Sequence, residues 1–490
     1  MDEPHLKRDL GLVRTTMLGI GGTLSAANFV IIGEAAGMAG YAVVPIVVIC
    51  GLLSLLTMFS YAELGTAIPL AGGEYTFSKV AYGGFPSFLT GWFEWLSNVF
   101  YTALSAIGFA YVVSYLFPEI NIPLTAVVVV IVFAIINLRG TKETATAETI
   151  ITIIVLAILA VFVVGAWVFL QGTPTTPESV APIGIFGIFA ATAYLFELYL
   201  GAEAVAAAQA EVKNPGRNIP LAIILSAVVL IALYTSVVVV AVGIVPPEVL
   251  SEQASPIAFV AGQALGPAGA VLVTVGLAIA GLAATNEAIM AQSRVLYAMS
   301  RDGYMPKVLC KVHKRFCTPH FAIMVGTIFT VIFAATGLVD FVVYAVNLGF
   351  IIGFSIVNLS VIKLRKIAPH LKRPFKVPLY PLTPIAGIAA SIFLALFIEP
   401  SVLILGFELI IVALLVYYIK MVGYHRIRIA FGGVSLGLGA FIAYIAYLVG
   451  TNAILQSVPQ EAVTLVLGFL LFVSIIQIIA GILNLLAADR

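Results

Sequence analysis

Apolar segments long enough to cross a membrane follow one another along almost the whole of this 490-residue chain. About 20 consecutive apolar residues in a helix span the hydrocarbon core of a bilayer. Hydrophobic residues make up 62% of the chain and charged residues 10%, which leaves too little polar surface for a water-soluble protein. The sequence therefore predicts an all-α polytopic membrane protein. Reading each apolar run as one span gives about fourteen, at residues 11–36, 41–69, 84–116, 122–139, 144–170, 181–209, 219–245, 267–300, 320–336, 339–363, 380–398, 401–420, 427–449 and 460–487.

The basic residues indicate how these spans are oriented. All 24 Lys and Arg residues fall before the first span, after an even-numbered span, or just inside a helix end that faces the same side. By the positive-inside rule this side is cytoplasmic, so we expect a multi-pass protein of the cell membrane with both termini in the cytoplasm. The first span lacks a small-residue cleavage site and is too long for the apolar region of a signal peptide, so it is expected to be part of the structure, and residues 1–10 before it to be a cytoplasmic segment. The basic residues reflect topology, and no nucleic-acid partner is expected.

Two spans carry small and polar residues at mid-depth. Backbone in hydrocarbon must satisfy its own hydrogen bonds, so such interruptions indicate a cavity rather than lipid. The affected positions in span one are Thr23, Ser25, Ala26, Ala27 and Asn28, and those in span six are Glu197, Leu200, Gly201 and Glu203. The two spans are five apart, and a repeat of five spans inverts its orientation, as in secondary transporters with a central site. The glycines could instead permit close helix packing, and for Gly19 and Gly21 both interpretations stay open.

Carboxylates also occur deep in apolar spans. Span eight adds Asn286 and Glu287, while no Lys or Arg lies in the middle of any span. We therefore expect Glu197, Glu203 and Glu287 to be protonated, solvated in a cavity, or paired with a group that arrives from outside. We assign Asn286, Glu287 and the positions in spans one and six to substrate binding, and Glu203 and Glu287 to proton coupling. Three further carboxylates are expected to be structural: Glu63, Glu94 and Glu408.

Cysteine and enzyme motifs indicate no catalytic chemistry. The ligand-type residues Cys310, His313, Cys317 and His320 are closely spaced, but Lys311, Lys314 and Arg315 among them oppose a dication, so a basic connection is expected. The G-x-S-x-G pattern at 433–437 lies within an expected helix and not at a strand-to-helix turn. No cofactor, metal or enzymatic activity is expected.

Four segments resemble the amino acid-polyamine-organocation superfamily of permeases. They are YAELGTAIPLAGGEY at 61–75, EVKNPGRNIP at 211–220, SRVLYAMSRDG at 293–303 and RPFKVPLYP at 373–381. The resemblance covers roughly residues 10–400. It implies a LeuT-like fold, with a transporter core at 11–363 made of inverted repeats at about 11–170 and 181–363. Residues 364–490 would then hold a cytoplasmic connection and about four additional spans, as in the cationic amino acid transporter branch.

The resemblance also implies roles for individual positions. Substrate would bind against the unwound parts of spans one and six, where a Gly-small-Gly pattern in the family corresponds to Ser25, Ala26 and Ala27. Glu203 matches a position linked to proton sensing in some members, and Glu197 stands where many members have an aromatic gate. Some proton-coupled relatives have a fifth-span lysine near the position of Val155, so the coupling ion stays open between proton and sodium.

The expected function is a secondary active transporter that imports an amino acid or related organocation by alternating access, with protons favoured as the coupling ion. The carboxylates favour a cationic amino acid modestly. A polyamine permease or exchanger is the alternative within this class. A membrane nutrient sensor without transport is an alternative from a different class, although the short cytoplasmic connections offer no long signalling segment. The expected partners are the substrate, the coupling ion and membrane lipid.

Overall fold

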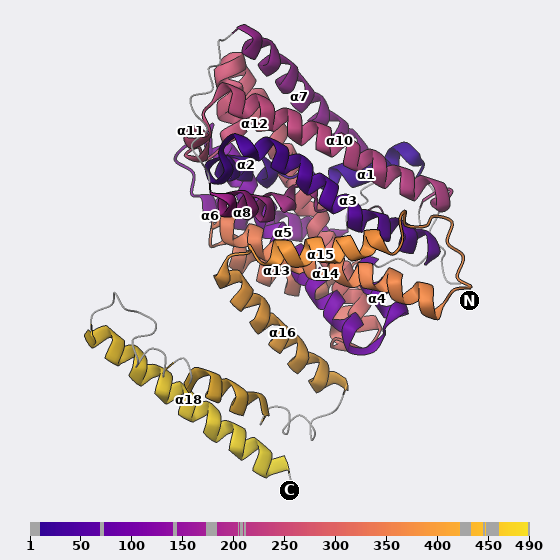
Figure 1. The fold of residues 1–490 in the computed structure, drawn as a ribbon, viewed down its shortest axis with the longest axis vertical. Coiled ribbons are helices and arrows are strands. Elements are labelled where there is room, and N and C mark those ends of the chain that lie inside the picture. The colour runs from indigo at the N-terminus through magenta and orange to yellow at the C-terminus, as the bar shows by residue number, and fades with distance from the viewer. Residues whose placement is uncertain are drawn as a thin grey trace. The chain divides into compact units, whose positions relative to one another are not determined.

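The chain is seen in a computed structural model that describes residues 10–68, 73–140, 145–172, 184–203, 205, 209, 212–421, 433–443, 446 and 460–488 (Figure 1). Within these ranges the protein is helical, and its one β-bridge is isolated. The chain divides into two compact units, Met1–Ile410 and Ile411–Arg490.

The helices of the first unit begin with two short ones in place of the first expected span. The elements up to residue 199 are α1 (Leu12–Gly21), α2 (Ala26–Ala39), η1 (Gly40–Ala42), α3 (Val43–Ala67), α4 (Gly73–Ala81), α5 (Gly84–Ser114), α6 (Ile122–Arg139), α7 (Ala145–Gly172), α8 (Ile185–Leu195) and η2 (Phe196–Tyr199). The later elements are α10 (Pro215–Ile244), α11 (Pro247–Ser251), α12 (Pro256–Arg301), η4 (Lys307–Cys310), α13 (His320–Ala334), α14 (Val339–Ile367), α15 (Leu382–Ala395) and α16 (Pro400–Met421), which runs into the second unit.

Eight helical runs in the described chain are long and apolar enough to cross a membrane, and five shorter apolar helices accompany them. One run, Ala26–Ala67, covers the end of the first expected span and most of the second, because η1 continues the helical path between α2 and α3. A second run, α12, consists of two helical parts that meet at a kink at Gly266, where φ is +72°. The multi-pass, all-helical class is confirmed, while the fourteen-span topology and the inverted repeats stay predictions.

Burial separates the central helices from the peripheral ones. The apolar window of α5 is 78% buried and that of α14 is 72% buried, whereas the window of α7 is 22% buried. On α7 the exposed side chains are themselves apolar, including Val161, Val164 and Val168. A helix that is apolar all round and yet exposed is suited to contact with lipid. Thus α5, which packs against α12 and α14, lies at the centre of the first unit.

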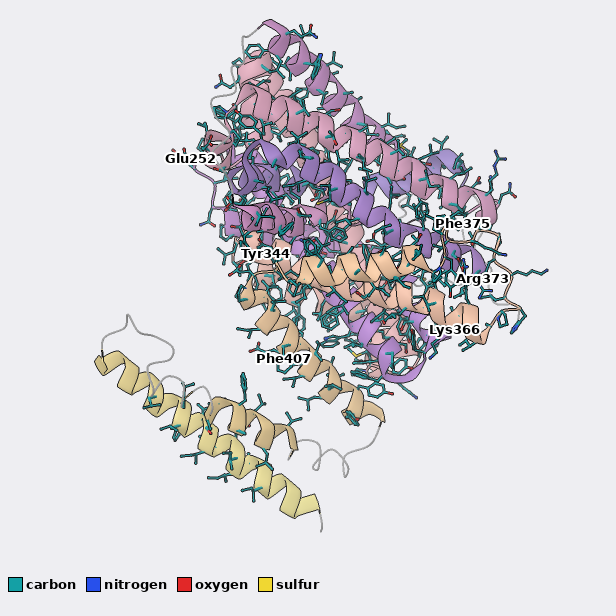
Figure 2. All side chains as sticks on the ribbon, viewed as in Figure 1. Glu252, Tyr344, Lys366, Arg373, Phe375 and Phe407 are labelled. Atoms are coloured by element: carbon teal, nitrogen blue, oxygen red, sulfur yellow. The ribbon has the colours of Figure 1, made fainter. Side chains whose placement is uncertain are left out.

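Connections that the sequence assigns to one side of the membrane meet each other in the structure. At the basic side, the Thr318 hydroxyl donates to the Leu138 carbonyl at 2.9 Å, and Lys79 pairs with Asp302 at 2.6 Å. At the other side, the Tyr111 hydroxyl donates to the Gly337 carbonyl at 3.4 Å. Figure 2 shows the labelled Lys366, Arg373 and Phe375 at one end of the bundle and Glu252 and Tyr344 toward the opposite end. We call the first of these the basic end.

A single parallel bridge joins Leu10, just before α1, to Val212, just before α10. Beside it, the Lys213 amide donates to the Leu10 carbonyl at 2.8 Å. Ser226 of α10 adds a second link, because its hydroxyl donates to the Thr16 carbonyl of α1 at 3.0 Å. The start of the first helix is therefore tied to α10 and to the segment that precedes it.

In the second unit, the helix at 433–443 packs on α18 (Gln460–Ala488) through a small residue. The Ser474 hydroxyl donates to the Gly439 carbonyl at 2.8 Å. A Cβ added at Gly439 would lie 2.5 Å from Ile478 Cγ1. Close backbone approach at a glycine together with a hydroxyl donor is typical of helix pairs in membranes.

Candidate functional site

The first helix break lies between α1 and α2, and side chains from α2, α5 and α10 satisfy its carbonyls. The Tyr101 hydroxyl of α5 donates to the Gly22 carbonyl at 3.1 Å. Asn28 Nδ2 and the Tyr234 hydroxyl donate to the Thr23 carbonyl at 2.8 Å and 3.3 Å. Because unpaired backbone groups are costly inside a membrane protein, these bonds stabilise the broken conformation.

Ser25 begins α2 as its N-cap. Its hydroxyl oxygen accepts a hydrogen bond from the Ala27 amide at 3.3 Å and donates to Ser105 Oγ at 3.1 Å. Ala27 also packs closely on α5, since a Cβ added at Gly108 would lie 2.4 Å from the Ala27 nitrogen. Ala27 is one of the positions expected to bind substrate, and its amide is bonded within the chain in this conformation.

The second break follows α8, where η2 leads into non-helical backbone. Leu200 is extended, with φ −81° and ψ 143°, and Gly201 has φ +112°. Both carboxyl oxygens of Glu203 lie 2.9 Å from the Gly201 amide, which donates to them. The glutamate thus satisfies an amide that the break exposes, in the way that a side chain caps a helix end.

The two breaks cross at their glycines. A Cβ added at Gly201 would lie 2.1 Å from the Gly22 carbonyl oxygen and 2.8 Å from the Thr23 nitrogen. A Cβ added at Gly22 would lie 3.1 Å from the Gly201 carbonyl oxygen and 3.2 Å from Glu287 Oε1. The structure therefore brings together three of the positions that the sequence predicted for the site: the first break, the second break and Glu287 of α12.

Burial divides the expected site residues into two groups. Those with no exposed surface are Thr23, Ser25, Ala26, Ala27, Asn28, Glu197 and Leu200. Gly201, Glu203 and Glu287 are partly exposed. Asn286 is 4% exposed and its Oδ1 accepts a hydrogen bond from Asn137 Nδ2 of α6 at 2.8 Å. The Asn286 amide is thus engaged in helix packing, while Glu287 beside it faces the crossing.

Glu197 is a buried carboxylate without a donor. Within the described ranges, neither of its oxygens has a hydrogen-bond partner, and Asn28 Oδ1 is also unpaired. Tyr101 and Tyr234 lie within electrostatic reach of Glu197, but both hydroxyls donate to carbonyls of the first break. Buried polar atoms are nearly always paired, so these acceptors indicate that a donor is supplied from elsewhere.

A cavity of about 290 Å³ lies beside the crossing, between α1, α6, α7 and α12. Glu287, Thr152 and Glu148 contribute polar groups to its wall. A Cβ added at Gly21 would lie 2.5 Å from Thr152 Oγ1, so α7 approaches the first break closely. Glu148 was not among the site residues predicted from the sequence, although a carboxylate four residues before Thr152 at the start of an apolar run was a signal that could have identified it.

Glu203 also has carboxylate neighbours that the sequence analysis did not join to it. Glu94 and Glu74 lie close enough to Glu203 and to each other for their charges to interact. Glu94 accepts a hydrogen bond from the Tyr75 amide at 2.8 Å, and Glu74 accepts a short one from the Tyr61 hydroxyl. The structural role expected for Glu94 is present, but its position relative to Glu203 depends on tertiary packing that no local pattern reveals.

Among the described residues, no group of His, Cys, Asp and Glu is arranged to hold a metal ion.

Comparisons with known proteins agree over most of the chain. A family model described as amino acid permease matches residues 10–422. The methylthioribose transporter of Bacillus subtilis is 33% identical over 443 residues, which cover 84% of this chain and 93% of the relative. A branched-chain amino acid permease of the same organism is 28% identical over 439 residues, covering 85% and 94%. The vacuolar cationic amino acid transporter 2 of Arabidopsis thaliana is 28% identical over 391 residues, covering 74% and 61%.

Proposed function

This chain belongs to the amino acid permease family of the amino acid-polyamine-organocation superfamily, and on that premise we propose that it is a proton-coupled secondary transporter for a cationic amino acid. Import would proceed by alternating access around the crossing of the two breaks. In this proposal residues 11–363 form the transporter core with inverted repeats at about 11–170 and 181–363, residues 364–490 add the further helices, and both termini lie in the cytoplasm.

The observation that carries the substrate class is Glu197. Glu197 is a fully buried carboxylate whose two oxygens have no donor in the described chain. Tyr234 lies within electrostatic reach of Glu197 and is also bonded to Asn28, whose Oδ1 is unpaired. An ammonium or guanidinium group of a substrate would supply the missing donors and the missing charge. The substrate's carboxylate would lie at the start of α2, where the helix N-terminus favours an anion.

Glu203 and Glu287 are the proposed coupling residues. Glu203 bonds to the Gly201 amide at the second break, so a change in its charge acts directly on the backbone that would face the substrate. Three carboxyl groups in mutual reach inside a protein cannot all be ionised without strong repulsion, which favours a shared proton on Glu203, Glu94 and Glu74. Glu287 faces the crossing and the cavity, and so would sense both substrate and proton.

Uptake into proteoliposomes tests the proposal. Labelled lysine, leucine, methylthioribose and a polyamine would be compared under an inward proton gradient, an inward sodium gradient and no gradient. We expect accumulation of lysine driven by protons. Preference for leucine or methylthioribose, which match the names of two relatives, would contradict the cationic class, and accumulation with sodium alone would contradict proton coupling. Substrate binding without any uptake would favour a sensor.

A further inference from the structure

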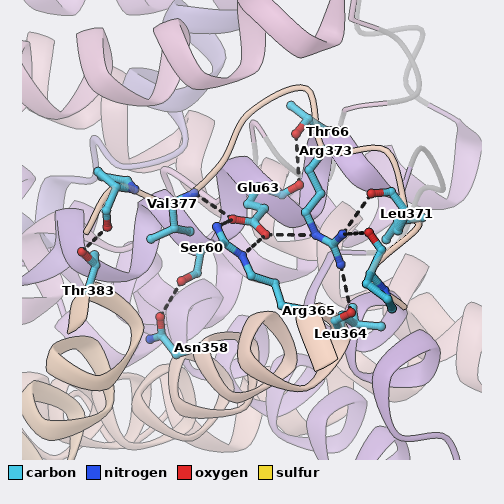
Figure 3. Close-up of polar contacts among 12 residues, drawn as sticks. Ser60, Glu63, Thr66, Asn358, Leu364, Arg365, Leu371, Arg373, Val377 and Thr383 are labelled. Carbon is cyan, nitrogen blue, oxygen red and sulfur yellow. Dashed lines mark hydrogen bonds and ion pairs between the residues drawn. The ribbon is translucent and has the colours of Figure 1, made fainter. Parts of the chain in front are cut away.

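A carboxylate on α3 is surrounded by four donors at the basic end of the bundle (Figure 3). Glu63 is 1% exposed. Arg365 of α14 donates to both of its oxygens, from Nε at 2.9 Å and from Nη2 at 2.5 Å. Arg373 Nε lies 3.2 Å from Glu63 Oε1, and the Val377 amide donates to Glu63 Oε2 at 2.7 Å. One buried carboxylate therefore holds two cations and a backbone amide.

The second cation also closes the end of α14. Arg373 Nη2 donates to the Leu364 and Ala368 carbonyls at 2.9 Å and 3.0 Å, and Nη1 donates to the Leu371 carbonyl at 2.9 Å. The Leu364 carbonyl lies in the last turn of α14 and the Ala368 carbonyl at its C-cap, where a cation is favoured by the helix dipole. Arg373 thus links the end of α14 to Glu63 on α3.

The connection between α14 and α15, residues 368–381, reaches two further helices; we call it the strap. Phe375 stacks on Phe59 of α3, with ring centroids 6.4 Å apart. Pro374 covers the start of α10, since a Cβ added at Gly216 would lie 2.7 Å from Pro374 Cβ. The strap therefore joins α3, α10 and α14 at one end of the bundle.

Two of these helices contact the site. The Tyr199 hydroxyl of η2 donates to the Val47 carbonyl of α3 at 2.7 Å, and Tyr234 of α10 bonds to the first break. α10 also packs against α1. Any motion of the breaks that shifts α3, α10 and α14 relative to one another would therefore strain or open the contacts of the strap.

Burying an ion pair is a poor way to gain stability, because the desolvation of the charges offsets much of their attraction, whereas a switch is a well-attested use for such groups. We propose that Glu63, Arg365 and Arg373 form a charge lock that is closed in the conformation seen here and opens during each transport cycle. Opening would free the strap from α3 and α10 and let the helices that contact the breaks move. The inference rests on the proposed transport function for its role, but the opening itself can be measured without a substrate.

The first experiment measures the lock directly. Spin labels at two exposed positions, Arg217 on α10 and Lys372 on the strap, report the distance between them in the purified full chain. We expect two distance populations, and Glu63→Gln should change their ratio toward the longer distance by about tenfold or more, as expected for the loss of a charged hydrogen bond. Glu119→Gln, an exposed carboxylate on the connection after α5, should leave the ratio unchanged. One population that is the same in both variants would overturn the lock.

The second experiment keeps the ion pairs intact and does not depend on the folding of Glu63→Gln. Phe59→Cys and Phe375→Cys are combined in a chain that carries Cys50→Ala, Cys310→Ser and Cys317→Ser. A bifunctional thiol reagent with a cleavable disulfide should stop uptake of the substrate found in the proteoliposome panel, and reductant should restore it. Full uptake by the cross-linked protein would mean that the strap stays closed throughout transport and that the lock is wrong. If the protein transports no tested substrate, the proposed function is contradicted. The distance between the spin labels at positions 217 and 372 then remains the test of the charge lock.

Discussion

At the scale of single residues, Gly201 is the most constrained position of the candidate site. Its φ of +112° lies in a region that residues with a Cβ avoid. Its neighbour across the crossing is backbone, the Gly22 carbonyl oxygen, at 2.1 Å from where a Cβ would stand. A flexible side chain could move aside, but backbone that is itself bonded to Tyr101 cannot do so without shifting the first break.

We predict that Gly201→Leu abolishes transport while the protein stays in the membrane, and that Gly201→Ala already reduces uptake strongly. The added Cβ would separate the two breaks that have to meet around the substrate. The measurement is initial uptake rate normalised to membrane protein. Gly303→Ala is the matched control, because φ is +87° there but nothing lies within 4 Å of the added Cβ. Normal kinetics in Gly201→Leu would show that close approach at this residue is not needed.

Glu197→Gln keeps the shape of the side chain and removes its charge. If Glu197 holds the positive group of the substrate, binding should weaken by about 1–3 kcal/mol, the range for hydrogen bonds to charged groups. A competition assay with lysine and leucine measures this, and the loss should be confined to lysine. Glu119→Gln removes an exposed carboxylate and should change neither affinity. Equal affinity for lysine in the parent and Glu197→Gln would remove Glu197 from the site.

Glu203→Gln mimics the protonated carboxyl and should separate exchange from accumulation. The variant should exchange internal for external substrate, because the Gly201 amide still finds an acceptor. It should fail to concentrate substrate when a proton gradient is the only driving force. Counterflow and gradient-driven uptake measure the two properties separately. Normal accumulation by the variant would move the coupling role to Glu287, Glu94 or Glu74.

Sequence alone could predict that glutamates of spans six and eight belong to the site, but not which other carboxylates lie near them. Glu197 and Glu287 stood out because a carboxylate in an apolar run is costly. Glu148, Glu94 and Glu74 come from other helices, and their approach to the site depends on how those helices pack. No periodicity along the chain encodes such a distance.

At the scale of elements, glycine and polar residues located both helix breaks correctly, whereas the short helix α4 was missed. Apolar runs reveal spans, but α4 (Gly73–Ala81) is short and amphipathic and lies between two of them. It is fastened at the basic end by Asp302, just after α12, which pairs with Lys79 at 2.6 Å and accepts a hydrogen bond from the Tyr75 hydroxyl at 2.7 Å. Such a helix is identified only by its partners.

The pairing of α4 makes stability depend on pH in a defined direction. Burial disfavours the charge of Asp302, but hydrogen bonds from Lys79 and Tyr75 outweigh it and lower the pKa of Asp302 below 3.8. The stabilisation is therefore complete above pH 3.8 and is lost as the pH falls through the lower pKa of the folded state. Asp302→Asn should destabilise the protein at neutral pH by about 1 kcal/mol.

Thermal unfolding in detergent measures this effect. The difference in unfolding temperature between the unmodified protein and Asp302→Asn should disappear in acid. Lys311 is an exposed lysine of the following connection, and Lys311→Met should unfold at the same temperature as the unmodified protein. A difference that persists unchanged at low pH would show that the pairing with Lys79 does not fasten α4.

At the scale of the whole molecule, the distribution of charge predicted which connections share a side. The pairs Leu138 with Thr318 and Lys79 with Asp302 meet at the basic end, as their assignment requires. Two of the last expected spans, 401–420 and 460–487, coincide with the helices α16 (Pro400–Met421) and α18 (Gln460–Ala488). Which end of the bundle faces the cytoplasm remains a prediction from the positive-inside rule.

Impermeant thiol reagents test this orientation in intact cells. In a chain with Cys310→Ser and Cys317→Ser, we expect Ser251→Cys to be labelled from outside and Gly216→Cys and Lys311→Cys to be labelled only after permeabilisation. The sequence makes the same prediction of outside labelling for Thr176 and Ser457, which lie outside the described residues. Labelling of position 311 in intact cells would reverse the proposed orientation.

Because of the parallel bridge between Leu10 and Val212, a probe just before α1 would report on the motion of both broken helices. A fluorophore attached at Gly11, where an added Cβ would meet no atom within 4 Å, would lie just before α1 and next to the bridge to the segment that follows the second break. Its signal would follow both broken helices at once, without any alteration of the residues that meet the substrate. For the same reason, a bulky domain fused before Leu10 would hinder the motion of the two broken helices. We therefore expect such a fusion to transport more slowly than the unfused protein.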